Sequence, residues 1–167
     1  EDWRWQTHLA NLPIYYEYKD NKVSNMDKIE FKYAENYKNI LDLYMDNSVS
    51  EKGLLGSVDV ATSMAEFALG QCAMVQNGNW AWSQISEVDG NTVKAEDIKF
   101  MPIYFGVDDA NEGLATGTEN YWCVNKNASE ADVKATLDFM NWCVTSEAGT
   151  KSMAEDMGFT IPFKTAE

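Results

Sequence analysis

The sequence has few basic residues and a single histidine, and these shortages exclude several functions. Thirteen Lys and Arg stand against 27 Asp and Glu, so the net charge at pH 7 is −14. A surface this acidic repels phosphate backbones and anionic lipid, so nucleic acid is not an expected partner. His8 is the only histidine, and no nucleophile stands in a recognisable relation to it. We therefore expect no histidine-based catalytic set and no enzyme activity.

The sequence also lacks long apolar runs and the motifs of cofactor chemistry. No run approaches the roughly 18 apolar residues that a membrane-spanning helix needs. The GxxxxGK[ST], GxGxxG and HExxH motifs are absent. Cys72, Cys123 and Cys143 lack zinc-site spacing and have apolar neighbours, which predicts buried, inert thiols. The sequence does not determine whether two of them form a disulfide. We expect neither a metal nor a cofactor.

Helical and strand patterns alternate along the chain. An amphipathic helix is predicted from Tyr33 to Met45, and a second from Asp59, as N-cap, to Gly70. Ser129 with Asp132 predicts the start of a long helix. Short helices are predicted from Trp80 and from 145 to about 158, and extended segments at 14–16, 72–76, 98–102 and 121–124. This order predicts an α/β fold for residues 1–167, a single lobe in which helices flank a mixed sheet.

The block from Asn77 to Trp82 is the most informative stretch for function. It reads NGNWAW and places wide aromatic rings at a predicted turn into a helix. The C–H face of a sugar packs on an indole, and its hydroxyls need directional partners such as Asn79. Trp80 and Trp82 diverge by roughly 200° in a helical turn, so at most one of them faces a ligand. The pattern favours a sugar-binding surface.

Residues 67–83, FALGQCAMVQNGNWAWS, resemble family 1 extracellular solute-binding proteins, the maltose-binding-protein-like components of ABC sugar importers. In that family a helix with Phe and Gly leads into an Ala-Met strand and a Gly-x-Trp turn. The later order of segments is similar too, including Tyr121 to Lys126 and the helix that holds Phe139 to Trp142. The resemblance extends over nearly the whole chain and is strongest from residue 59 onward.

The resemblance implies a periplasmic-binding-protein-like II fold and a two-lobed clamp that closes over its ligand. This chain resembles the C-terminal lobe, so the N-terminal lobe and the final helices would be further parts of the same protein. The implied function is carbohydrate binding for import, with a mono- or oligosaccharide as ligand and the membrane permease of an ABC importer as partner. The implied location is extracytoplasmic, either periplasmic or lipid-anchored at the cell surface.

The resemblance also implies site residues. In the family the first Trp of the turn commonly stacks on sugar, which corresponds to Trp80, while Trp82 is expected in the core. The segment from Gly117 to Trp122 borders the family's cleft, so Gly117, Tyr121 and Trp122 are further candidates. Asn79 stands where the family often has Pro.

Because 27 acidic residues guarantee chance carboxylate pairs, a carbohydrate-active enzyme or accessory carbohydrate-binding domain is the alternative.

Overall fold

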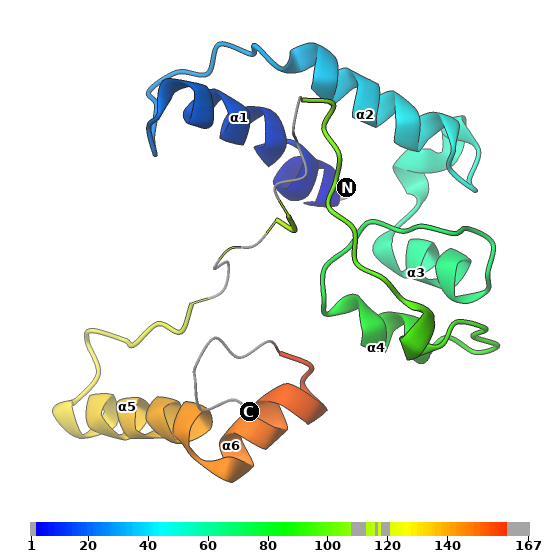
Figure 1. Ribbon diagram of the computed structural model, residues 1–167. Helices are drawn as coiled ribbons and strands as arrows, with labels where there is room; N and C mark the ends of the chain where they lie inside the picture. Colours follow the sequence, from blue (N-terminus) through cyan, green and yellow to red (C-terminus); the bar gives the residue numbers. More distant parts are fainter. Residues whose placement is uncertain (1–2, 108–112, 116, 118–120, 160–167) are drawn as a thin grey trace. The chain divides into compact units, whose positions relative to one another are not determined.

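The computed structural model describes residues 3–107, 113–115, 117 and 121–159. Two compact units divide the chain, residues 1–115 and residues 116–167, and each is described by itself. The first unit contains η1 (Arg4–Leu9), α1 (Asn11–Asn21), α2 (Ala34–Asp46), η2 (Lys52–Ser57), α3 (Val60–Ala68), α4 (Ala81–Ser86) and η3 (Ala95–Asp97). The second contains α5 (Glu130–Thr145), α6 (Glu147–Lys151) and η4 (Ser152–Asp156) (Figure 1).

The described residues form helices, turns and irregular segments but no strand, so the predicted mixed sheet is wrong. Residues 14–16 lie inside α1. The segments 72–76, 98–102 and 121–124 carry no strand assignment. A strand exists only when its backbone N–H and C=O groups pair with a neighbouring strand, and apolar, β-type residues alone do not supply that pairing. The α/β classification therefore does not hold for this structure.

The long helices agree with the prediction because their ends are encoded locally. α2 begins after Tyr33 and buries Ile40. α3 begins at the predicted N-cap, where the Asp59 carboxylate accepts the Thr62 N–H at 2.8 Å and the pKa of Asp59 is lowered by that bond. α5 begins after Ser129, whose hydroxyl accepts the Asp132 N–H at 3.2 Å. Such side-chain caps satisfy the unpaired amides of a first helical turn.

The first unit has two apolar clusters, and the larger one joins its amino-terminal helices to a later segment. Leu9 from η1, Tyr16 from α1 and Ile40 from α2 are buried around Phe105. The Tyr16 and Phe105 rings stack with centroids 5.6 Å apart and an interplanar angle of 3°. Burying four such side chains stabilises this part of the unit by several kcal/mol, since each contributes about 1.5–3 kcal/mol.

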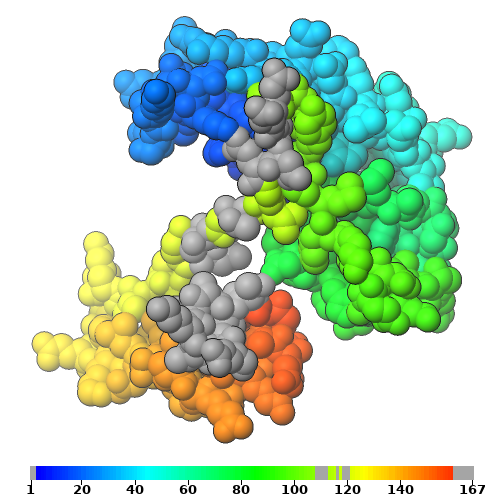
Figure 2. All heavy atoms as spheres, in the orientation of Figure 1, coloured from blue at the N-terminus to red at the C-terminus, as the bar shows by residue number. Residues whose placement is uncertain are grey.

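The second cluster joins α3 to α4 and thereby positions the turn between them. Met64 and Ala68 from α3 pack against Ala81 and Ile85 from α4. The two helices lie side by side (Figure 1), and in Figure 2 the green spheres of this part of the chain form one continuous mass. Residues 69–80 connect these helices. Because α3 and α4 are packed together, this segment must turn back so that it ends beside the helix from which it started. Trp80 stands at the return point.

The second unit packs α6 against the end of α5 through a glycine. Gly149 is buried, and a Cβ built on it would lie 2.6 Å from the Trp142 carbonyl oxygen and 2.7 Å from the Cys143 Cα. Cys143 is buried, as predicted, whereas Cys72 is half-buried and Cys123 is exposed. Burial raises the pKa of the Cys72 thiol, with a smaller contribution from Glu66. All three are free thiols, so burial of the cysteines was predicted correctly only for Cys143.

Replacing Gly149 by Ala is expected to destabilise the contact between α5 and α6 by about 1–3 kcal/mol, because the new methyl group meets backbone atoms that cannot rotate away. Hydrogen exchange of the amides in α6 measures the loss as faster exchange. Gly53→Ala is the control, because nothing lies within 4 Å of a Cβ at that position. Unchanged protection of the α6 amides in Gly149→Ala would contradict the close approach.

Candidate functional site

The turn before α4 is held by the side chain of Asn77. Its Oδ1 accepts the Gly78 N–H at 2.9 Å, and its Nδ2 lies 3.3 Å from both the Met64 Sδ and the Gln84 Oε1. The Ala81 N–H then donates to the Gly78 carbonyl at 3.0 Å. One side chain thus ties the turn to α3, to α4 and to its own backbone. These bonds fix the point at which residue 80 leaves the turn.

The indole of Trp80 lies against the backbone of Gly78. A Cβ at residue 78 would be 2.1 Å from the Cζ3 atom of the ring, so only glycine leaves room for the indole in this place. The Trp80 side chain is 39% exposed. It is therefore neither enclosed by the core nor free in solution, and part of its apolar surface is available to a ligand.

Two rings from the other end of the first unit complete this surface. The Trp80 ring centroid lies 6.0 Å from that of Trp3 and 6.1 Å from that of His8. Trp3 and His8 are themselves 4.9 Å apart in an edge-to-face arrangement, with an interplanar angle of 87°. The three rings thus contact one another pairwise, within the range in which aromatic side chains attract. We call Trp3, His8 and Trp80 the aromatic cluster.

The aromatic cluster is held together by polar bonds to Gln76. The buried Arg4 donates from Nη1 to the Gln76 carbonyl at 3.1 Å and from Nη2 to the Ser63 hydroxyl at 3.1 Å. The Gln76 side-chain amide also bonds the His8 Nδ1. Both ends of η1 are therefore tied to the segment that leads into the turn. This arrangement positions the Trp3 and His8 rings beside the turn that carries Trp80.

Of the residues predicted for this site, the structure places Trp80 and Asn79 side by side at the turn, and both are exposed. Trp82 is 38% exposed, so the expectation that it belongs to the core is wrong. It lies inside the short helix α4, where the apolar cluster is supplied by Ala81 and Ile85 instead. No ring contact joins Trp82 to the aromatic cluster.

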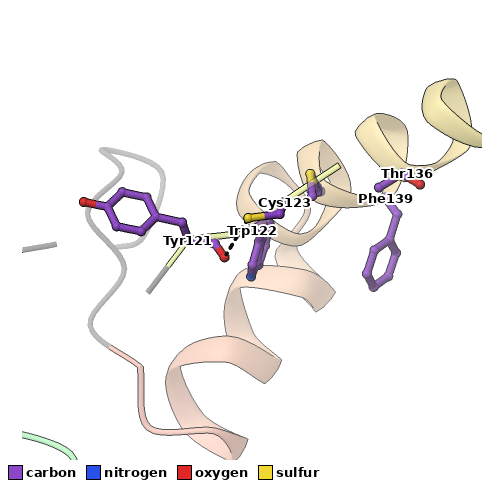
Figure 3. A pocket seen from close by; sticks show the side chains of 6 residues that line it. Tyr121, Trp122, Cys123, Thr136 and Phe139 are labelled. Carbon is purple, nitrogen blue, oxygen red and sulfur yellow. Dashed lines mark hydrogen bonds between the residues drawn. The ribbon is translucent and has the colours of Figure 1, made fainter. Parts of the chain in front are cut away.

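The remaining predicted residues lie in the second unit. Tyr121 and Trp122 are exposed, and Gly117 is exposed with nothing within 4 Å of a Cβ built on it. Figure 3 shows the Tyr121 ring directed away from α5 and the Phe139 ring projecting from that helix. A hollow of about 360 Å³ lies here, lined by Tyr121, Trp122, Cys123, Thr136, Phe139 and Met140.

Sequence reasoning missed Trp3, His8 and Gln76 as members of the candidate site. The only available signal was the aromatic richness of the first 18 residues, and that signal does not say which later residue these rings contact. His8 is bonded through its Nδ1 to the Gln76 side chain, 68 residues further along the chain. Within the described ranges no group of three His, Cys, Asp or Glu side chains could hold a metal ion.

The comparisons with known proteins give a family. A family profile described as "Bacterial extracellular solute-binding protein" matches residues 3–167. Comparison with curated proteins and comparison with solved structures give no match. Over the residues that the structure describes, every helix is too short or too polar to cross a membrane. Because the match covers nearly the entire chain, this protein belongs to the bacterial extracellular solute-binding proteins, which act outside the cytoplasm and bind a solute that is to be transported.

Proposed function

We propose that the solute is a carbohydrate, a mono- or oligosaccharide, and that the chain acts without catalysis as part of the substrate-binding component of an ABC importer. Its partners in this proposal are the sugar, the importer's membrane permease, and an N-terminal lobe of the same protein. In this proposal residues 1–167 contribute to solute binding, and the importer's nucleotide-hydrolysing subunit is a further partner.

The observation that carries the proposal is the half-exposed indole of Trp80, fixed in place at a turn. Stacking a sugar on an indole removes the apolar faces of both from water, and this gain is largest when the ring does not lose freedom on binding. Gly78 beneath the ring and Asn77 behind the turn provide that fixed position. The Trp80 ring is therefore ready to bind before the ligand arrives.

A sugar also needs partners for its hydroxyl groups, and the same stretch supplies amide side chains. Asn79 is exposed next to Trp80, and its amide offers both a donor and an acceptor. An aromatic face with a few amide groups beside it is typical of sites that bind neutral sugars. In the second unit, Gly117, Tyr121 and Trp122 remain candidate ligand contacts on the family resemblance.

Replacing Trp80 by Ala in the full-length protein is expected to weaken sugar binding by about tenfold to a hundredfold, because the stacked apolar surface is lost. Isothermal titration calorimetry against a panel of mono- and oligosaccharides measures the dissociation constant. Trp82→Ala is the matched control: it removes an equally exposed indole, 38% against 39%, from a position two residues further along, inside α4. Full affinity in Trp80→Ala, or an equal loss in both variants, would remove the role assigned to Trp80.

A further inference from the structure

The turn before α4 contains an asparagine followed directly by a glycine, Asn77 and Gly78, the only such pair in the sequence. This pair is chemically reactive, because the amide nitrogen of the second residue can attack the side-chain carbonyl carbon of the first. Glycine has no Cβ and leaves that nitrogen unhindered. Both residues are half-buried, which leaves the turn accessible to water. Whether the pair reacts then depends on how the fold holds the two reacting groups.

The fold places the attacking nitrogen against the side chain that it would attack. The Gly78 N–H donates to the Asn77 Oδ1 at 2.9 Å, and the carbon to be attacked, Cγ, is covalently bonded to that same oxygen. A rotation of the Asn77 side chain is therefore enough to turn Cγ toward the nitrogen. Reacting groups held this close already have much of the orientation that the step needs.

The leaving group is the Asn77 side-chain nitrogen, and only weak bonds hold it. Its Nδ2 lies 3.3 Å from the Gln84 Oε1, which is longer than the usual range of about 2.7–3.2 Å for such a bond. Its other contact, also at 3.3 Å, is with the Met64 Sδ, and a thioether sulfur is a weak acceptor. The short contact in this turn is therefore the one between the reacting groups.

We propose that Asn77 is a site of spontaneous deamidation, so that the turn modifies itself. The Gly78 nitrogen loses its proton to hydroxide and forms a bond to the Asn77 Cγ. The Cγ–Nδ2 bond breaks, and Nδ2 takes up a proton from water and leaves as ammonia. Water then opens the cyclic succinimide at either carbonyl and gives aspartate or isoaspartate at residue 77. Overall one water is consumed and one ammonia is released, with no oxidant, reductant or enzyme.

Either product changes the turn that carries Trp80. Both add a negative charge and lose the amide donor of Asn77. Isoaspartate also routes the main chain through the former side chain and lengthens it by one CH₂ group. The Ala81 N–H, which donates to the Gly78 carbonyl at 3.0 Å, then loses its acceptor, and the indole loses its place against the glycine backbone. This consequence does not depend on which solute the protein binds.

Incubation of the purified full-length protein at neutral and at mildly alkaline pH, followed by peptide mass spectrometry, tests the proposal. Residue 77 should gain about one dalton, with isoaspartate among the products, and should react faster at the higher pH. Asn47 and Asn127 are internal controls, because both are exposed and are followed by Ser48 and Ala128. We expect residue 77 to react at least about tenfold faster than either control. Equal rates at the three positions, or no reaction at residue 77, would overturn the proposal.

The same reaction in guanidinium chloride separates the effect of the fold from that of the sequence. The folded chain should modify Asn77 at least as fast as the unfolded chain, because the fold already brings the reacting groups together. A much slower reaction in the folded chain would mean that the turn protects Asn77. Asn77→Gln should abolish the reaction, since the longer side chain cannot close the same ring. Asn47→Gln is the matched control and should leave the rate at residue 77 unchanged.

The consequence for the turn has a readout of its own. The modified protein carries one more negative charge, so anion exchange separates it from the unmodified protein. Hydrogen exchange of the Ala81 amide should be at least about tenfold faster in the modified form, because the bond to the Gly78 carbonyl opens locally. Equal protection of this amide in the two forms would show that the turn keeps its shape and would overturn the proposed displacement of Trp80.

Discussion

Replacing Glu17 by Gln is expected to lower the free energy of unfolding of the first unit by about 3 kcal/mol. Glu17 lies in α1 and is 0% exposed. Its Oε2 accepts the Glu30 N–H at 2.7 Å, and its Oε1 accepts the Lys32 N–H at 2.9 Å. Glutamine has one acceptor oxygen and one amide donor at its end. It can therefore satisfy only one of these two backbone amides and places a donor against the other.

The backbone between those two amides shows why the carboxylate is needed. Phe31 adopts a left-handed conformation, with φ of 60°, and its ring is exposed. A left-handed residue turns successive N–H groups toward one side of the chain and forms a small anion-binding concavity. The Glu17 carboxylate occupies this concavity. The segment between α1 and α2 is thereby fastened to α1 by two charge-assisted hydrogen bonds.

Urea denaturation followed by circular dichroism measures the loss for Glu17→Gln. Glu35→Gln is the control, because Glu35 is exposed on α2 and its substitution should change the free energy of unfolding by less than about 0.5 kcal/mol. The explanation is wrong if the two variants unfold at the same urea concentration.

Truncating Met64 to Ala is expected to cost about 2–5 kcal/mol, the range observed when a buried Met, Leu or Ile is reduced to Ala. Met64 is 1% exposed and lies at the contact of α3 with α4. The cavity would remove packing from Ala81 and Ile85, on which the position of α4 depends. The substitution would also remove the Met64 sulfur atom, which lies 3.3 Å from the Asn77 Nδ2.

The effect of Met64→Ala should therefore extend to the candidate site. We expect a lower midpoint of urea denaturation together with a shift in tryptophan fluorescence, because the turn that carries Trp80 loses its support. Met64→Leu keeps the volume and should cost less than about 1.5 kcal/mol. Met74→Ala is the surface control, since Met74 is 74% exposed. Equal stability of Met64→Ala and Met74→Ala would show that Met64 does not support this contact.

One difference between prediction and structure comes from Pro13. The sequence predicts residues 14–16, directly after this proline, as extended, whereas α1 runs from Asn11 through these residues. Pro13 is the third residue of the helix, within the first turn, where amides have no intrahelical acceptor and a missing N–H costs nothing. A proline in a sequence can therefore mark either the end of a helix or its first turn, and which of these applies depends on where the helix begins. Leu9 and Tyr16 decide that choice by packing on Phe105.

Local patterns in the sequence determined the helices after Tyr33, Asp59 and Ser129, because capping side chains and an apolar face act within a few residues. They also determined that an indole stands at the turn before α4. Tertiary structure decided which segments found hydrogen-bond partners, and so removed the predicted sheet. It alone brought Trp3 and His8 to Trp80, more than seventy residues along the chain. That contact depends on Arg4 and Gln76 meeting in space, and no spacing within a short window of sequence encodes such a meeting.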